Sequence, residues 1–79
     1  MNLFMTKQEA LMTWCKHKML FSSVDVCEYG MNNFYKRAEQ TVRELASNPT
    51  NTVRRISQSD CIRRGLNKPG QAPIAWWEV

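Results

Sequence analysis

One stretch organises the fold of this chain, residues 32–46, which reads NNFYKRAEQTVRELA. It contains no Pro or Gly, and the Ser47-Asn48-Pro49 that follows is a typical helix stop. Asn side chains are good N-caps, so the stretch predicts a helix over about 33–46. At about 100° per residue, its apolar positions share one face. These positions are Phe34, Ala38, Thr41, Val42 and Leu45.

The opposite face of this helix is polar and carries amides and cations. Side chains of these types bind phosphates and base edges in DNA. The face therefore predicts the recognition helix of a small DNA-binding domain, although any surface helix is polar on its outer side. Its residues are Asn33, Lys36, Gln40, Arg43 and Ser47, with Arg37 and Glu44 on the flank.

Length and charge limit what the chain can do. Its 79 residues amount to one domain at most, residues 1–79, with a core too small for a deep catalytic pocket. The net charge of +4 favours a polyanionic partner. The charge is uneven, however. Residues 23–48 hold four acids against three bases, whereas residues 49–79 hold five bases against two acids.

The sequence offers no chemistry for catalysis or for a metal. Three cysteines without a CxxC spacing argue against both a disulfide framework and a zinc site. His17 has no evident nucleophile or orienting partner, and no phosphate-cradling Gly loop occurs. We therefore expect no enzyme activity, no cofactor and no metal. Without a secretory leader or an apolar run of about 20 residues, we expect a cytoplasmic protein with no membrane partner.

Two further helices are predicted before residue 33. Thr6-Lys7-Gln8-Glu9 is a capping box that starts a helix over about 7–17. Ser22-Ser23-Val24-Asp25 starts another over about 23–29, which we expect to bury Val24 and Cys27, with Val26 as a further candidate, and to end on Gly30 with positive φ. Between them, residues 19–21 are apolar and suit a short strand. A short helix, a Gly turn and a longer helix form a helix-turn-helix.

The last third of the chain predicts an antiparallel hairpin, with strands over about 52–57 and 74–79 rich in β-formers. Trp76 and Trp77 point to opposite faces, so one of them should join the core with Trp14, Phe34 and Leu45. The intervening residues 58–73 form a long loop, in which Ser57–Asp60 can cap one helical turn that ends at Gly65.

This order of elements resembles the winged helix-turn-helix family, and in particular the small helix-turn-helix proteins of bacteriophages and prophages. The fold class expected is therefore α+β, with three helices, a short strand and a C-terminal hairpin, the wing. Two features depart from the family pattern: Ser47-Asn48-Pro49 replaces a Gly turn, and the wing is long and contains Cys61. The matching residues are Thr6-Lys7-Gln8, Ser22-Ser23-Val24-Asp25-Val26, Arg37-Ala38, Val42-Arg43-Glu44-Leu45, Val53-Arg54-Arg55-Ile56 and Ala75-Trp76-Trp77-Glu78-Val79.

The resemblance implies that the third helix enters the major groove of double-stranded DNA and that the wing follows the backbone. The protein would then be a non-catalytic phage regulator, active in transcription regulation, or an accessory DNA-binding factor in a bacterial host. A homodimer would be expected if it reads two half-sites. The DNA-binding residues expected are Asn33, Lys36, Arg37, Gln40, Arg43, Arg54, Arg55, Arg63, Arg64 and Lys68.

The alternative is a phage-encoded protein-binding module that occupies a host protein and inhibits or redirects it. Asp25 and Glu28, the second Trp and the long loop would then form the interface. The excess of acids within residues 23–48 favours this alternative. A structural role in a phage particle is a third, weaker candidate.

Overall fold

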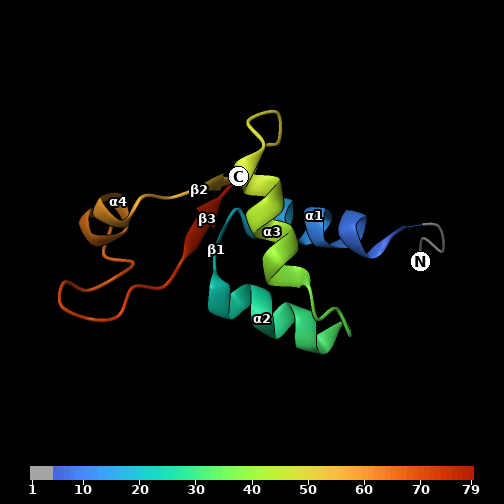
Figure 1. Ribbon diagram of the computed structural model, residues 1–79, viewed down its shortest axis with the longest axis horizontal. Coiled ribbons are helices and arrows are strands. Elements are labelled where there is room, and N and C mark those ends of the chain that lie inside the picture. The colour runs from blue at the N-terminus through green and yellow to red at the C-terminus, as the bar shows by residue number, and fades with distance from the viewer. Residues whose placement is uncertain (1–4) are drawn as a thin grey trace.

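The computed structural model describes residues 5–79; the start of the chain, where no secretory leader is expected, lies outside the described residues. This part of the chain has an α+β fold with four helices and a three-stranded antiparallel sheet (Figure 1). None of these helices is long and apolar enough to cross a membrane. The elements are α1 (Lys7–Lys18), β1 (Leu20–Ser22), α2 (Ser23–Asn32), α3 (Ala38–Ser47), β2 (Arg54–Arg55), α4 (Gln58–Arg63) and β3 (Trp76–Glu78).

The last strand lies in the middle of the sheet, whose order is β1-β3-β2. Trp77 of β3 pairs with Phe21 of β1 on one side and with Arg55 of β2 on the other. The predicted hairpin is confirmed, but its strands are much shorter than 52–57 and 74–79. The ladder ends early because Ser57 caps α4 on one strand and Pro73, which has no N–H, precedes the other.

The core lies between the sheet and helices α1, α2 and α3. Trp77 is buried and stacks on Phe21 with ring centroids 6.1 Å apart, while Trp14 packs against Phe21 at 5.2 Å. One Trp of the pair therefore does enter the core, as predicted. The buried cluster comprises Leu11, Cys15, Phe21, Val26, Ala38, Val42, Val53 and Trp77.

Three helices begin at the caps that the sequence predicts. The Thr6 hydroxyl accepts from the Glu9 N–H at 3.1 Å, and the Ser57 hydroxyl accepts from the N–H three residues later at 3.2 Å. At α2, Ser22 and Asp25 form a reciprocal capping box. The predicted single turn after Ser57 is α4. These caps satisfy N–H groups that have no partner within the helix.

The junction between α2 and α3 differs from the prediction. Helix α2 continues to Asn32, so Gly30 lies inside it and is not its C′ residue. Phe34 takes the left-handed conformation instead (φ 53°), and the Tyr35 N–H donates to the Gly30 carbonyl at 2.7 Å. This is the 6→1 bond of a Schellman motif, with Phe where Gly is usual. The motif needs a positive φ after Asn33, which the sequence does not indicate.

The predicted start of the third helix at residue 33 is therefore wrong. The Asn33 amide donates to the Tyr29 carbonyl at 2.9 Å and so closes α2, and α3 begins only at Ala38. Phe34, expected in the core, is 87% exposed. Val24 and Cys27 are also exposed, because α2 turns Val26 and Gly30 inward.

Beyond the sheet the chain extends as an arm, defined here as residues 56–75, which carries α4 away from the other helices (Figure 1). The arm gives the molecule its length, with extents of 44 × 27 × 18 Å. It has a small interior of its own, in which Ile56 and Cys61 are buried apart from the main cluster.

Candidate nucleic-acid interface

The outer face of α3 is polar and exposed, as predicted, because Ala38, Val42 and Leu45 turn the opposite face into the core. Gln40, Arg43 and Ser47 lie on this outer face, separated from the buried positions by about half a turn. Lys36 and Arg37 precede the helix; Arg37 is its N-cap residue without a capping side chain. The polar face predicted from the sequence is therefore exposed, but Asn33, Lys36 and Arg37, which were predicted to lie on this helix, precede its first residue.

Acids within α3 pair with its arginines. The Arg43 guanidinium donates to Glu39 at 2.7 Å, one turn away, and Arg37 lies 3.9 Å from Glu44. The bond from Arg43, and a second from the Cys27 thiol, hold the pKa of Glu39 below its usual value. These pairs are exposed, and exposed ion pairs contribute little stability. Both arginines can therefore exchange their carboxylate for another anion at small cost.

The two arginines of β2 point to opposite sides of the sheet. Arg54 is opposite Glu78 in the sheet register, on the side away from the helices. Arg55 is opposite Trp77, and its guanidinium lies 5.7 Å from the Trp77 ring centroid. As a result only Arg55 faces α3.

Arg43 and Arg55 both line one shallow hollow of about 240 Å³, although they are 12 positions apart in the chain. Its other lining residues are Ala46, Ser47 and Trp77. The guanidinium of Arg55 rests on the Trp77 ring, which holds it in place at the floor. Two arginines that line one hollow suit a phosphate, which accepts paired N–H donors, once the Arg43 guanidinium releases the Glu39 carboxylate.

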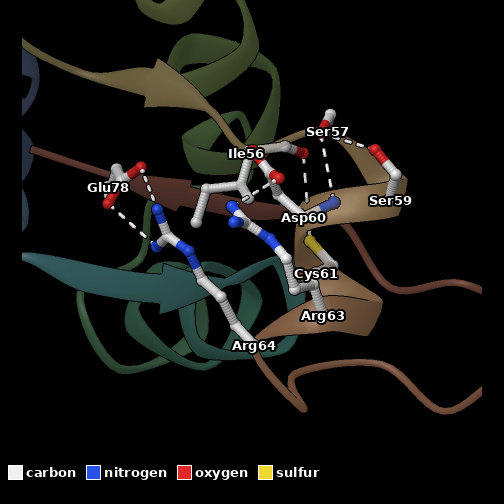
Figure 2. Close-up of polar contacts among 8 residues, drawn as sticks. All are labelled: Ile56, Ser57, Ser59, Asp60, Cys61, Arg63, Arg64 and Glu78. Carbon is white, nitrogen blue, oxygen red and sulfur yellow. Dashed lines mark hydrogen bonds and ion pairs between the residues drawn. The ribbon is translucent and has the colours of Figure 1, made fainter.

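The remaining predicted cations, Arg63, Arg64 and Lys68, lie on the arm. Arg63 pairs with Asp60 at 2.7 Å inside α4, and Arg64 reaches across to the Glu78 carboxylate with bonds of 3.0 and 3.1 Å (Figure 2). The second contact joins α4 to β3, so Arg64 has a structural use. Lys68 is exposed and makes no ion pair within residues 5–79.

The structure separates Asn33 from the α3 face. Its side chain closes α2 and lines a groove between α1 and α2 that also includes Trp14 and Asp25. The predicted site residues are therefore divided: one group lies on and just before α3 with Arg55 beside it, another lies on the arm, and Arg54 and Asn33 each face another side.

Asn67 is a residue whose importance the sequence did not indicate. It is only 7% exposed and links two parts of the arm to the start of β3. Its amide N–H groups donate to the Gln58 side chain at 3.0 Å and to the Ile74 carbonyl at 2.9 Å, while its oxygen accepts from the Trp76 indole at 3.2 Å. The arm thereby covers Trp76. A lone Asn in a loop with Gly and Pro reads as a turn residue, so only the fold reveals this role.

The described residues offer no obvious reaction centre. Within residues 5–79, no group of three or more His, Cys, Asp and Glu side chains could hold a metal ion. The three thiols are free; Cys15 and Cys61 are buried, whereas Cys27, which the sequence predicts to be buried, is exposed. Burial raises the pKa of the Cys15 thiol to about 11, so this thiol is a poor nucleophile near neutral pH.

Comparisons with protein-family models, with curated protein sequences and with solved structures give no match to this chain. Its function must therefore be inferred from its own residues.

Proposed function

We propose that this protein is a winged helix domain that binds double-stranded DNA without catalysis, as a small phage or prophage regulator or accessory factor. In this proposal α2 and α3 form the helix-turn-helix, and the arm is the wing. Two features support it: the order α1-β1-α2-α3-β2-β3, and a sheet in which the last strand is central. The insertion of α4 makes this wing longer than a simple hairpin.

The observation that carries the proposal is the convergence of Arg43 and Arg55. One arginine comes from the exposed face of α3 and the other from the base of the wing. A DNA backbone that follows the edge of the major groove would meet both at once. Phosphate contacts of this kind set the position of a protein on the duplex.

The length of α3 fits this mode of binding. Its 10 residues span about 15 Å, and the major groove is about 12 Å wide. With the Arg43–Arg55 hollow on a phosphate, Gln40 faces the groove and can bond to base edges. Lys68 is exposed on the wing and is available for a flanking phosphate. Arg64 is less available because two bonds hold it on Glu78, whereas the exposed pair of Arg63 with Asp60 can be exchanged as readily as that of Arg43.

Binding to a duplex, measured by fluorescence anisotropy against salt concentration, tests the proposal. We expect Arg43→Glu and Arg55→Glu each to weaken binding and to reduce the salt slope by about one. Lys16→Glu is the matched control, because it reverses a charge on the outer face of α1 and should leave the slope unchanged. The proposal is overturned if no duplex binds at about 50 mM salt, or if the control weakens binding as much as the other two.

A second candidate is the binding of a host protein. It is favoured by one observation: both arginines of the α3 region already face a glutamate of the same helix, Glu39 or Glu44. A protein interface accepts such mixed charge more readily than DNA does. Recovery of one stoichiometric partner from a host lysate, unchanged by nuclease treatment, would favour this candidate over DNA.

A further inference from the structure

An apolar surface lies on the exposed side of α2 and on the turn that follows it. We call it the α2 patch; it consists of Val24, Cys27, Met31 and Phe34. The first three are spaced i, i+3 and i+7 and so share one face of the helix. Val24 is 58% exposed, Met31 80% and Phe34 87%. Single exposed apolar residues are ordinary, but contiguous ones mark sites of interaction.

Phe34 has an unfavourable backbone conformation, and its apolar ring is exposed to solvent. Its φ of 53° is rare for a bulky residue, and its ring makes no aromatic contact within the described residues. Gly would close α2 equally well at this position. Residues in this conformation are enriched at functional sites, so the exposed ring of Phe34 is a candidate contact for a partner.

A groove of about 300 Å³ adjoins the patch. Gly30 and Ala38 supply small residues where α2 and α3 meet, Tyr35 and Met31 contribute larger side chains, and Lys36 and Glu39 bring charges. Its volume is at the lower end of the range for small-molecule pockets, so it suits one inserted side chain better than a drug-sized ligand.

We propose that the α2 patch is a homodimer interface, in which the Phe34 ring of each copy enters the groove of the other. A protruding ring and a groove on one surface are self-complementary, which is what a two-fold interface requires. This assignment does not rest on DNA as the partner, because it uses neither the Arg43–Arg55 hollow nor the arm.

The charges around the patch favour a second copy as the occupant. Two acidic residues of α2, Asp25 and Glu28, lie in the part of the chain that forms the first half of the α2 patch. Lys36 follows Phe34, the last residue of the patch. Neither Glu28 nor Lys36 makes an ion pair within residues 5–79. A two-fold axis that passes between them brings the Glu28 carboxylate of each copy to the Lys36 ammonium of the other. Two such pairs at the rim set the orientation of the dimer.

The dimer is expected to be weak. A stable interface of standard size buries about 800 Å² on each partner, or roughly one seventh of the 5736 Å² exposed here. Four apolar side chains and two rim pairs make a smaller contact than that. We therefore expect a dissociation constant of about 10–100 µM, dominated by Phe34 and Met31.

Sedimentation equilibrium of the full chain from about 5 to about 500 µM is the test. We expect a monomer–dimer equilibrium that Met31→Asp weakens about tenfold or more. Met19→Asp is the matched control, since Met19 is 61% exposed, undergoes the same change and lies outside the patch. Phe34→Gly should weaken the dimer as strongly while leaving Tm unchanged or higher, which separates a lost interface from a lost fold.

Cys27 gives a second readout, because it lies in the patch and is the exposed thiol while Cys15 and Cys61 are buried. A short bis-maleimide should link two copies through Cys27 in the parent chain and in Met19→Asp, but not in Phe34→Gly. A chain that stays monomeric up to about 500 µM overturns the proposal. A dimer that Met31→Asp and Met19→Asp weaken equally also overturns it. The same holds if Cys27 becomes protected from maleimide only when another protein is added.

Discussion

Gly30→Ala should destabilise the fold, against the usual effect of this substitution in a helix. Gly30 lies inside α2, where Ala is ordinarily better by about 1 kcal/mol. At this position, however, an added Cβ would lie 2.6 Å from the Tyr35 carbonyl oxygen and 3.2 Å from the Ala38 Cβ. The first distance is shorter than real Cβ contacts allow, and the atom it meets is backbone.

The size of the effect follows from what must move. The Tyr35 carbonyl cannot shift alone, because the Tyr35 N–H is bonded to Gly30 at 2.7 Å and its oxygen accepts from the Ala38 N–H at 3.3 Å. The turn and the start of α3 must therefore move together. Overpacking of this kind costs about 3 kcal/mol at the upper end of its range. Subtracting the gain in helix propensity leaves a loss of about 2 kcal/mol in the free energy of unfolding.

Thermal unfolding followed by circular dichroism measures this loss. For a chain of this size, about 2 kcal/mol corresponds to a decrease in Tm of about 8–16 °C. Gly65→Ala is the comparison, because Gly65 has nothing within 4 Å and only its φ of 77° opposes a side chain. That change should cost about 1 kcal/mol. If Gly30→Ala melted higher than the parent chain, the close approach of α2 and the turn would be wrong.

Three further predictions concern other parts of the fold. Asn67→Ala should leave the Trp76 indole and the Ile74 carbonyl without their partner, which lowers the free energy of unfolding by about 1–3 kcal/mol. Hydrogen exchange in the arm should become faster, and unchanged exchange there would refute the role given to Asn67. Ser22→Ala removes the capping box of α2 and should lower the free energy of unfolding in urea by about 1 kcal/mol, whereas Ser23→Ala, inside the helix, should have a smaller effect. The third concerns Cys15, because burial raises the pKa of its thiol from 9.0 to about 11. The protonated thiol therefore contributes fully to the free energy of unfolding below pH 9, and this contribution is lost as pH rises through about 11. The loss is up to about 2–3 kcal/mol and should be absent in Cys15→Ala.

Local chemistry made part of this fold predictable. Thr6, Ser22 and Ser57 act on N–H groups within three residues, so their caps can be recognised without any tertiary contact. The inner face of α3 was predictable for the same reason, since Ala38, Val42 and Leu45 repeat at helical spacing. The α+β class and the pairing of the last two strands followed from these elements and from the β-forming residues near the C-terminus.

The errors occurred where a tertiary contact overrides local preference. Two Asn residues before a polar, helix-forming stretch indicate a helix start, yet Asn33 closes α2 because Gly30 allows the chain to fold back against it. Phe34 then takes the positive φ that the turn requires, and its ring is excluded from the core. The burial predicted for Phe34 depended on a helix that begins five residues later than expected.

The candidate site divides in the same way between local and distant contacts. The pair between Arg43 and Glu39 is four residues apart on one helix, so the sequence itself indicates it, and it argues for an interface of mixed charge. The approach of Arg43 to Arg55 depends on the sheet, because the Trp77 ring holds the Arg55 guanidinium on the side that faces α3. Arg43 is already paired with Glu39, whereas Arg55 makes no ion pair within residues 5–79. The charge of Arg55 beside the hollow is therefore the feature that favours an anionic partner, and the local pair sets the cost of releasing Arg43 to bind it as well.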